Sequence, residues 1–571
     1  MMQTASYYRL LCAIVLVSGL AAMAPVYGQE TWEKEGEGEI KDLEIELTKE
    51  RQVTLPQANR FFEKVPPRPF EPIVPAITYA PRDFTFSSPN YVPVIRPLRI
   101  RQEELAKLYG NYLSAGIGNY TSFMVDGSIA TKRDKKKMLG ADFYWRGFGK
   151  GPVDDDHSAQ STTRINVFGS AATEAAHLGG SVNYLNQRGY FYGYPAGTDV
   201  DRDALKQTYQ TVAAKFYLEN KKKTDINYRF DAGFSRKTDA YVTAESEWTV
   251  GFKGDYTLKD GQQLLLGADI ALIRREDSLF SENRSLVRLQ PAYQFKPMSQ
   301  LLLTVGANIA LSNDKFPDGS GGFRIFPHAR ADYALSDKVG VFAVLTGNMD
   351  KVNLHSLTQE NFWLDANQPF VNTVRSFEFE GGIKASVGSR LDARLGAGYA
   401  TLDNLYFYQA VRDPFNPSGA TVSTAFDKFA LVYDRTTGRF NPYLEAAFDP
   451  SGVFSTSFRV DYFHYATDIL AEAWHRPAYR ADVRLHYNLF DKVQLQAGII
   501  VQGGMKAQDP SLGTVSNLKT ATDLHLKARY FLSRQISAFV ELDNLLANEY
   551  PIFFNYPARG FQAMAGVSWS F

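Results

Sequence analysis

The strongest constraint in this sequence is an alternation of apolar and polar residues that recurs from about residue 110 to the C-terminus. In residues 226–234, apolar side chains occupy the even positions, and polar side chains or glycine occupy the odd ones. Residues 391–399, 479–488 and 524–530 follow the same rule. Because successive side chains of a β-strand point to opposite faces, each segment is predicted to be a strand with one apolar and one polar face. The sequence therefore predicts an all-β domain.

The lengths of the strands and of their connections favour a transmembrane antiparallel β-barrel over a soluble sandwich, which also alternates. We count about 22 candidate strands of about 10 to 15 residues, enough for a tilted bilayer crossing. Connections after even-numbered strands are tight and those after odd-numbered strands are mostly long, as in a barrel with both termini on its short-turn side. The tight connections include residues 259–262, 335–337, 388–390, 449–452, 491–492 and 533–535. The long ones include residues 194–206, 349–372, 409–423, 466–477, 506–521 and 547–558.

Residues 1–28 have the pattern of a signal peptide for export. A basic residue precedes an apolar stretch, residues 10–20, that is too short to cross a bilayer as a helix. Val26 and Gly28 are the small residues that cleavage after Gly28 requires. Cys12, the only cysteine, lies in the apolar stretch, and we interpret it as apolar filler rather than a lipid-attachment site. No later stretch approaches 18 consecutive apolar residues, so we expect membrane insertion as a barrel.

Residues 29–108 differ in composition from the predicted barrel, residues 109–571. Their first part is acidic, and ten of the 26 prolines of the chain fall between Pro56 and Pro97. Proline at this density discourages helix interiors and central strands. We interpret residues 29–108 as an extended proline-rich segment in the periplasm or the barrel lumen that needs a partner surface to become ordered.

The last strand carries a pattern of its own. Val567, Trp569 and the C-terminal Phe571 share one face of the predicted strand. A terminal aromatic residue at the end of an alternating strand resembles the insertion signal that bacterial outer-membrane proteins present to their barrel-insertion machinery. We therefore expect the cell outer membrane as the location, with the N- and C-termini periplasmic.

Residues 542–550 and 556–571 resemble the end of TonB-dependent receptor barrels, in which an Asn-Leu pair, a tyrosine and a Pro-x-Arg-Gly turn precede the last strand. Residues 55–60 and 115–120 resemble the receptor-like barrels of Bacteroidota, and the resemblance implies a Gram-negative origin and transport. Receptors of this family carry a plug of well over a hundred residues, which residues 29–108 are too few to form. The matching motif residues are Asn544, Leu545, Tyr550, Pro557, Arg559 and Gly560.

A barrel of about 22 strands would be roughly 40 to 45 Å across, too wide for wall side chains to fill. We expect the proline-rich segment, an inward loop such as residues 349–372, or another protein to narrow it. Both signs of charge alternate on the predicted lumen face, and we favour mutual neutralisation over an ion-selective path. The predicted lumen-facing charged residues are Arg229, Asp231, Asp392, Arg394, Arg459, Asp461, Arg480, Asp482, Arg484, His486, Lys527 and Arg529.

The sequence indicates no catalytic residues, metal site or cofactor. The eight histidines fall in no HExxH or similar spacing, and no GxSxG motif occurs. Residues 154–157 carry oxygen ligands but lack the glycine and glutamate of a calcium loop, so solvated charge is favoured. Aromatic residues cluster at 361–365, 405–408, 473–475 and 550–556. We expect most of them to form the interfacial girdle and a subset to face inward and bind a ligand.

These observations predict a barrel of TonB-dependent-receptor type, not an enzyme, that passes a solute across the outer membrane. The alternative is a non-transporting barrel subunit of an outer-membrane complex for assembly or secretion, and a surface adhesin or outer-membrane enzyme is less favoured. The expected partners are outer-membrane lipid, barrel-insertion machinery, and TonB or another envelope protein. Nucleic acid is not expected, because 62 basic and 62 acidic residues give zero formal net charge.

Overall fold

A computed structural model describes residues 109–571 except 133, 135, 195–198, 222–223, 259–260, 279–280, 317–321, 389, 413–426, 450–451 and 511. The described residues belong to the second of two units of the chain, Glu103–Phe571. The predicted signal peptide, the proline-rich segment and the resemblance at residues 55–60 therefore lie outside the described residues. Their boundaries stay predictions.

The described chain forms a closed antiparallel β-barrel of 22 crossings. Each strand pairs with the next along the chain, and the last strand pairs with both its predecessor and the first. The sheet has 23 strands, of which β17 and β18 follow one another along β16 and make a single crossing. The predicted fold class and strand number are thus confirmed.

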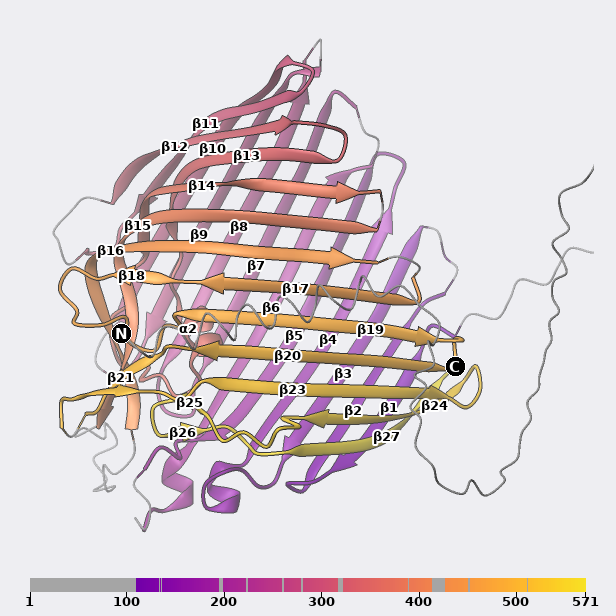
Figure 1. The fold of residues 1–571 in the computed structure, drawn as a ribbon, viewed down its shortest axis with the longest axis vertical. Helices are drawn as coiled ribbons and strands as arrows, with labels where there is room; N and C mark the ends of the chain where they lie inside the picture. The colour runs from indigo at the N-terminus through magenta and orange to yellow at the C-terminus, as the bar shows by residue number, and fades with distance from the viewer. Residues whose placement is uncertain are drawn as a thin grey trace, which may run out of the picture. The chain divides into compact units, whose positions relative to one another are not determined.

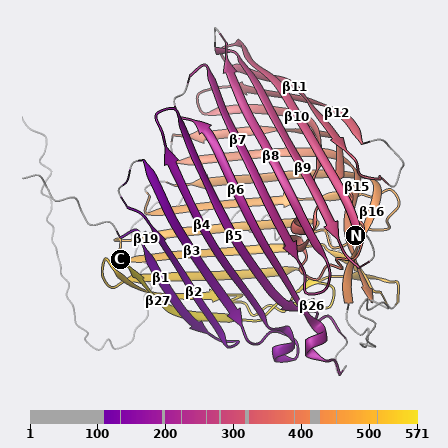
Figure 2. The same ribbon diagram turned by 180° about the vertical axis from the view of Figure 1, so that it is seen from behind.

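The bounds of the barrel strands are β1 Tyr112–Gly118, β2 Ser122–Ala130, β3 Lys137–Phe148, β4 Gln160–Ala172, β5 Ala176–Tyr190, β6 Lys206–Asn220, β7 Ile226–Thr238, β8 Ala244–Thr257, β9 Gln263–Glu276, β10 Ser281–Met298, β11 Leu301–Ser312, β12 Phe323–Ala334, β13 Val339–Asp350, β14 Thr373–Val387, β15 Leu391–Arg412, β16 Asp427–Phe448, β17 Phe454–Tyr462, β18 His464–Ala466, β19 Tyr479–Leu489, β20 Val493–Gly503, β23 Ala521–Phe531, β24 Ile536–Asp543 and β27 Gln562–Ser570. Figure 2 shows β1 to β11 running side by side with a common tilt.

The two ends of the barrel differ, as the predicted alternation of short and long connections requires. Phe571 and Asn111 lie at the short-turn end, where the Phe571 amide donates to the Asn111 carbonyl at 2.9 Å. The extra elements of the described chain occupy the long connections, and Figure 1 shows several of them at the end opposite the C-terminus. They are η3 Asp155–Ser158, η4 Arg202–Leu205, α2 Leu354–Glu360, β21 Lys506–Gln508, β22 Val515–Asn517, β25 Pro551–Phe553 and β26 Tyr556–Pro557.

One long connection lies three to four residues later in the chain than expected. The sequence suggests a loop over residues 409–423, whereas β15 continues to Arg412 and β16 begins at Asp427. Both strands have 22 residues, which is more than any other strand of the described barrel. The added residues pair regularly, from Gln409 opposite Ala430 outward, so this hairpin extends the barrel wall at the long-loop end.

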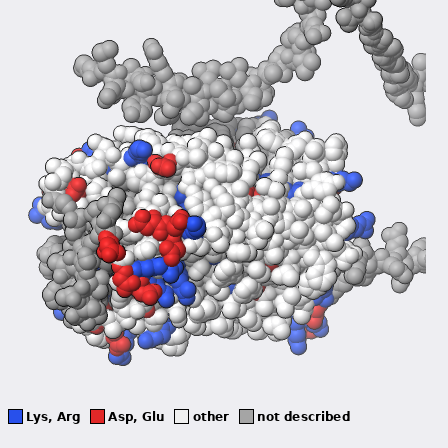
Figure 3. Space-filling model, turned by 90° about the horizontal axis from the view of Figure 1, so that it is seen from below, with Lys and Arg blue, Asp and Glu red and all other residues white. Residues whose placement is uncertain are grey.

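The outer surface of the barrel carries exposed apolar side chains. On β9, Leu264, Leu266, Ile270 and Leu272 are exposed, whereas Ala271 and Ile273 of the opposite face are buried. Figure 3 shows a wide uncharged band on one side of the molecule, with charged side chains gathered toward its ends. A band of this kind is what a lipid-facing barrel surface requires. Among the described residues, no helix is long and apolar enough to cross a membrane.

Candidate functional site: the polar barrel wall and the segment across its mouth

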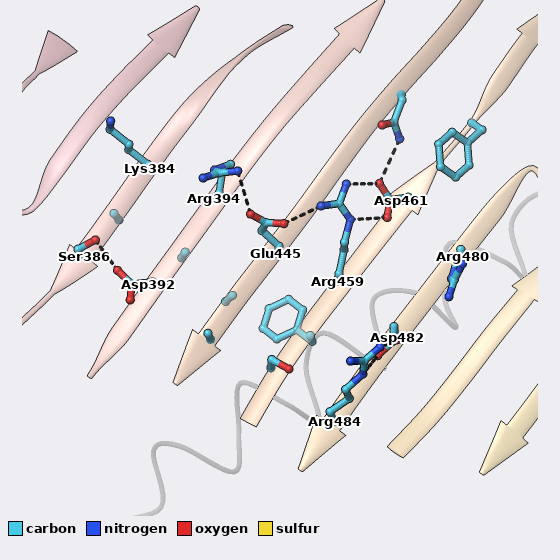
Figure 4. Close-up of a pocket in the computed structure, with 18 of the residues that line it drawn as sticks. Lys384, Ser386, Asp392, Arg394, Glu445, Arg459, Asp461, Arg480, Asp482 and Arg484 are labelled. Carbon is cyan, nitrogen blue, oxygen red and sulfur yellow. Dashed lines mark hydrogen bonds and ion pairs between the residues drawn. The ribbon is translucent and has the colours of Figure 1, made fainter. Parts of the chain in front are cut away.

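The polar faces of β14 to β19 line a cavity of about 790 Å³ (Figure 4). Arginine is the commonest charged residue in its lining, and acidic residues stand between the arginines on neighbouring strands. The cavity brings together seven of the twelve charged residues predicted from the alternation. They are Asp392, Arg394, Arg459, Asp461, Arg480, Asp482 and Arg484.

Ion pairs cross this wall from strand to strand. Glu445 of β16 lies opposite Arg394 of β15 and Arg459 of β17, and it pairs with both at 3.2 and 2.7 Å. Arg459 also pairs with Asp461, two residues along its own strand, at 2.7 Å. Alternate residues of a strand share a face, so the R-x-D spacing predicts this contact. Among the described residues, Arg480 has no ion pair. The wall is therefore largely, though not fully, neutralised.

The adjoining part of the wall has a different chemistry. The polar faces of β5 to β13 line a second cavity of about 1170 Å³, in which amides and hydroxyls such as Asn227, Gln290 and Thr304 are frequent. The predicted residue Arg229 lines this cavity and pairs with Asp231 at 2.7 Å and with Glu219 at 2.9 Å. Arginines thus dominate the first cavity, whereas the second combines amides and hydroxyls with charges of both signs, including Lys253 and Asp255.

The remaining predicted residues lie farther around the wall. His486 lines a third cavity, of about 490 Å³, together with Arg484. Lys527 pairs with Glu541 and lies 5.7 Å from the ring centre of Phe539. Arg529 of β23 lies opposite Gln494 and Phe539 in the register of the sheet. That the whole set faces a lumen stays a prediction.

Residues 351–372, here called the cross-segment, join β13 to β14 and contain α2. Phe362 packs edge-on against Tyr209 of β6, with ring centroids 5.3 Å apart. The carbonyl of Trp363 accepts the amide of Phe429 in β16 at 3.1 Å, and Leu364 forms a parallel bridge with Phe429. The sixth and sixteenth crossings lie on opposite sides of a barrel of 22. The cross-segment therefore spans the mouth at the long-loop end, as expected of an inward loop at residues 349–372.

Arg284 of β10 holds both ends of the cross-segment. Its guanidinium forms a fork with Asp314 at 2.9 and 2.8 Å, and it also donates to the Val352 carbonyl at 2.8 Å and to Asn372 Oδ1 at 2.9 Å. Asp314 in turn accepts the Asn372 amide at 2.7 Å. The side chains of this pair are 3% and 0% exposed. A buried pair with satisfied hydrogen bonds fixes geometry more than it adds stability.

Two glutamates of β8 receive the first turn of α2. Glu245 accepts the backbone amide of Leu354 at 2.9 Å, and Glu247 accepts the Asn353 side-chain amide at 2.9 Å. Asn353 Oδ1 also caps the helix by accepting the Ser356 amide at 2.8 Å. Carboxylates at a helix N-terminus satisfy amides that have no partner within the helix. The barrel wall thus supplies part of the N-cap of α2.

Glu360, at the other end of α2, is held by groups from two elements. It accepts the hydroxyls of Tyr406 and Tyr408 of β15 at 2.7 and 2.8 Å and pairs with Arg476 Nη1 at 2.5 Å. Burial alone would raise the pKa of the Glu360 carboxyl. The charge of Arg476 and the two tyrosine hydroxyls outweigh it and lower that pKa below its ordinary value. Glu360 is therefore a charged anchor for α2.

His475, the residue before Arg476, is buried as a neutral side chain. Its Nδ1 lies 2.6 Å from the Tyr408 carbonyl, and its Nε2 accepts the Phe554 amide at 3.3 Å. Burial lowers the pKa of His475 to about 4, although the hydrogen bond to Tyr408 acts in the opposite direction. His475 joins β15 to the last long connection, and this role requires an unprotonated Nε2.

A hydrophobic core lies at the long-loop end, between the cross-segment and the surrounding loops and strand ends. Trp363 stacks on Tyr556 with ring centroids 4.2 Å apart, and both are buried. Gly189 permits the approach of Phe362, because a Cβ at this position would lie 2.6 Å from the Phe362 ring. We refer to the cluster as the mouth core. Its buried members are Tyr190, Phe191, Tyr192, Tyr194, Val200, Leu205, Val352, Leu354, Leu357, Trp363, Leu364, Ala366, Phe370, Tyr408, Ala410, Phe429, Leu431, Phe553 and Tyr556.

This core corrects the expectation for the loop aromatics. Most were expected in the interfacial girdle, where one side of the ring meets lipid. Trp363, Phe407, Tyr408, Trp474 and Tyr556 are instead less than a tenth exposed. The loops are long enough to fold on one another, and burying an aromatic side chain fully releases more surface from water than lying at an interface does.

Solved structures share this architecture. The ferric-catecholate import receptor Fiu of Escherichia coli K12 superposes with a TM-score of 0.61 at 12% identity, covering 81% of each chain. FpvAI in its complex with pyocin S2 gives 0.60 at 13% identity over 81% of this chain and 70% of that one. The ferric enterobactin receptor PfeA of Pseudomonas aeruginosa gives 0.59 at 12% identity over 81% and 80%. The fold is that of the TonB-dependent receptor barrels. No family model and no curated sequence matches this chain.

The receptor-like motif near the C-terminus has a structural role in this barrel. Asn544 Nδ2 donates to the carbonyls of Asn548 and Arg559 at 3.1 and 2.9 Å, so one side chain joins the two ends of the last long connection. Tyr550 donates to Asp523 Oδ2 at 3.1 Å, and Arg559 lies 4.1 Å from the ring centre of Phe148. The other motif residues, Leu545, Pro557 and Gly560, belong to the same connection or to β26 within it.

The final strand of the receptor-type barrel closes the sheet. β27 pairs with β24 and β1, and Val567 and Trp569 are exposed on its apolar face. The ring of Phe571 stacks on Trp569 with centroids 4.5 Å apart. This face is the one predicted to carry the insertion signal, and its recognition by insertion machinery stays a prediction.

Acidic residues at the mouth form ion pairs and hydrogen bonds instead of a metal site. Asp155 pairs with Lys150 at 2.7 Å, and Asp154 accepts the hydroxyl of Tyr194 at 2.7 Å. Among the described residues, no group of three histidine, cysteine or acidic side chains has the geometry to hold a metal ion.

The residues that hold the cross-segment were not identified from the sequence. Arg284 lies in an alternating strand like the arginines of the cavity wall, and no local signal separates it from them. Glu360 lies in a loop that was predicted to fold inward, and Arg476 follows the aromatic residues at 473–475. The available signal was a charged residue next to the loop aromatics. A carboxylate that is buried beside aromatic side chains needs a partner of opposite charge.

Proposed function

We propose that this protein transports a polar solute across the outer membrane through the barrel, and that the cross-segment closes the outer mouth. The support is a TonB-dependent receptor fold whose solved neighbours include an import receptor and siderophore receptors. In this proposal the twelve charged residues predicted from the sequence line the lumen, both termini are periplasmic, and catalysis has no part.

The single observation that carries the proposal is the contrast between the two faces of the wall. Apolar side chains are exposed on one face of the strands, while the other face lines cavities of about 790 and 1170 Å³ rich in charged and amide side chains. A barrel used only as a scaffold has no need for such cavities. A transported solute needs groups that replace its hydration.

The test is the conductance of the purified protein in planar bilayers. We expect the full chain to conduct weakly, because the mouth core excludes water. Replacing residues 354–366 by a short Gly-Ser linker is expected to raise the current severalfold. Replacing residues 509–514, in the β21–β22 loop, by the same linker provides a matched control that should leave the current low. Weak conduction by both variants would contradict a path closed by the cross-segment.

Solute uptake supplies the second part of the test. Cells that express the protein under a TonB-dependent and a TonB-independent condition are compared for uptake of labelled polar solutes. Transport lost together with TonB would identify TonB as the partner. Uptake that does not depend on the protein in any condition would contradict the transport proposal.

A second candidate function is favoured by the mouth core. Trp363 and Tyr556 belong to a dry cluster that resembles a protein interior, as a non-transporting barrel subunit of an envelope complex would allow. Stoichiometric co-purification with other envelope proteins, combined with a linker variant that still does not conduct, would favour this reading. If the protein were an adhesin or a surface enzyme, its activity would map to the long loops and would survive substitutions in the cavity wall.

A further inference from the structure

We propose that the cross-segment is a hinged flap. Arg284 holds its hinge, Glu360 and Arg476 latch its far end, and the buried ammonium of Lys237 opposes closure. The role of this flap in transport rests on the proposed function, but its movement does not. The hinge, the latch and Lys237 lie on different elements. The hinge and the latch hold the flap in place and Lys237 opposes closure, so each can be tested by itself.

The hinge follows from the positions of the two ends of the cross-segment. The Val352 amide donates to Asn372 Oδ1 at 2.9 Å, so the first and last parts of the segment lie side by side. Just outside the two ends of the segment, Asp350 at the end of β13 and Thr373 at the start of β14 are still register partners. A segment with adjacent ends can swing without changing the strands that carry it. Arg284 contacts both ends and is buried, so it fixes the axis of that movement.

The latch is concentrated at the far end of α2. Glu360 pairs with Arg476, and Arg476 Nη2 donates to the Tyr406 carbonyl at 3.0 Å. The other polar contacts of this part of the segment come mainly from Trp363, Asp365 and Gln368 with Phe429 and Leu431 of β16, the second strand after β14, and from the Ala366 carbonyl with Arg275 of β9. Hydrogen bonds between charged groups are stronger than neutral ones, so loss of the Glu360 charge should release the far end first.

Lys237 of β7 lies beside the first turn of α2. It is the register partner of Glu245, which accepts the Leu354 amide with both carboxylate oxygens. The positive charge of Lys237 is also close enough to His355 in α2 to help burial lower the pKa of that histidine. Lys237 is 2% exposed, and its ammonium nitrogen has no hydrogen-bond acceptor.

The environment of Lys237 compensates its charge only in part. Its nitrogen lies 4.7 Å from the ring centre of Tyr209, which is a favourable contact for a cation. Glu245 is near, but its oxygens are occupied by α2. A buried ammonium without an acceptor is unfavourable, and opening the flap would return it to water. Lys237 should therefore favour the open state, in opposition to the latch.

The first experiment measures opening by cysteine labelling. The natural chain has one cysteine, Cys12 in the predicted signal peptide, so an added cysteine can be followed alone. Ala366→Cys places a small buried reporter in the cross-segment, and its rate of reaction with a maleimide reports exposure. Ala310→Cys, buried in β11 in a cluster with Met349 and Val374 just below the hinge, is the control for general loosening of the barrel wall.

The two substitutions are expected to act in opposite directions. Glu360→Gln should raise the labelling rate of the Ala366→Cys reporter by about tenfold or more, because a charged hydrogen-bonded pair is lost. Lys237→Met should lower the rate several-fold, and Lys237→Gln should lower it less. The Ala310→Cys rate should change in none of them. Equal rates in all backgrounds, or a higher rate with Lys237→Met, would overturn the proposal.

A disulfide gives the second measurement. Leu364 and Phe429 are bridge partners, so Leu364→Cys with Phe429→Cys is expected to tie the far end shut and suppress labelling of a third cysteine at position 366 until a reductant is added. Asp350→Cys with Thr373→Cys forms the same link below the hinge and should leave labelling unchanged. Suppression by both links would overturn the hinge at Arg284. Labelling requires no solute, so a failure to transport would contradict the proposed function and leave the flap intact.

Discussion

Arginine–carboxylate pairs occur in two regions of this barrel and serve them differently. In the cavity wall, Arg459 and Glu445 are 48% and 30% exposed, and both have further partners. At the base of the cross-segment, Arg284 and Asp314 are 3% and 0% exposed. Water can replace a partner in the first pair but not in the second. The same chemistry therefore lines a wet surface in one region and fixes a segment in the other.

The two regions also differ in how their contacts are distributed along the chain. Wall pairs join neighbouring strands or alternate residues of one strand, as Arg459 does with Glu445 and Asp461. The mouth brings together β10, the cross-segment and the loop before β19. Local pairs tolerate loss because neighbours repeat them, whereas each mouth contact occurs once. We expect substitutions at the mouth to have larger effects.

The largest effect is expected from Arg284→Met. The change leaves the Asp314 carboxylate buried without its partner and releases both ends of the cross-segment, which should lower the free energy of local opening by about 3 to 5 kcal/mol. Hydrogen exchange of the amides of Val352 and Asn372 measures this opening. Exchange unchanged from the natural protein would show that the buried pair does not hold the segment.

The next effect tests the mouth core. Trp363→Ala removes a side chain that stacks on Tyr556 and donates to the Tyr190 carbonyl at 3.0 Å. We expect a loss of about 3 kcal/mol in local stability, mainly from the cavity that remains. Fluorescence-monitored unfolding of the detergent-solubilised protein, with hydrogen exchange for the loops, provides the measurement. Trp363→Phe, which keeps most of the ring area, should recover much of the loss.

A smaller effect should appear with pH. His475 has a pKa of about 4 when buried and about 6.5 in the opened state, so the opened state binds the proton first as pH falls. Stability of the mouth is complete above about pH 6.5 and falls progressively toward pH 4, with about 2 kcal/mol lost by pH 5. The pKa of Glu360 is below its ordinary value, which keeps this carboxylate charged in that range. Exchange rates of the mouth amides between pH 7 and 5 test this. His475→Gln should remove most of the dependence.

The smallest effect is expected in the cavity wall. Arg459→Gln removes a pair that is exposed to water, and Glu445 retains Arg394, so we expect less than about 1 kcal/mol of destabilisation. The melting temperature should change little. A loss as large as that of Arg284→Met would mean that the two regions do not differ in the way that their exposure indicates.

Much of the barrel could be predicted from the sequence because its determinants are local. The period of two fixes which face of a strand is apolar, and turn chemistry such as Ser533-Arg534-Gln535 fixes where a strand reverses. The strand number and the parity of short and long connections were predicted in this way. The inward loop at residues 349–372 was one of three alternatives inferred from the width of the barrel, beside the proline-rich segment and another protein. The chain closes through β27 because the alternation of that strand continues to its last residue.

The contacts at the mouth of the barrel could not be predicted in the same detail. Arg284 meets Val352 and Asn372 across 68 and 88 residues, and no periodic pattern links them. The sequence showed which loops carry the aromatic residues of the mouth core. It did not show that these residues are buried, because the same residue types also suit a membrane interface.

The sequence by itself determined a closed barrel with an apolar outside and a polar opposite face, because side-chain direction in a strand depends only on position along it. Only the tertiary structure decided that loops from across the chain share a dry core and that Arg284 is buried while Arg459 is wet. Burial depends on which distant segments exclude water from a side chain, and that is a property of the assembled fold.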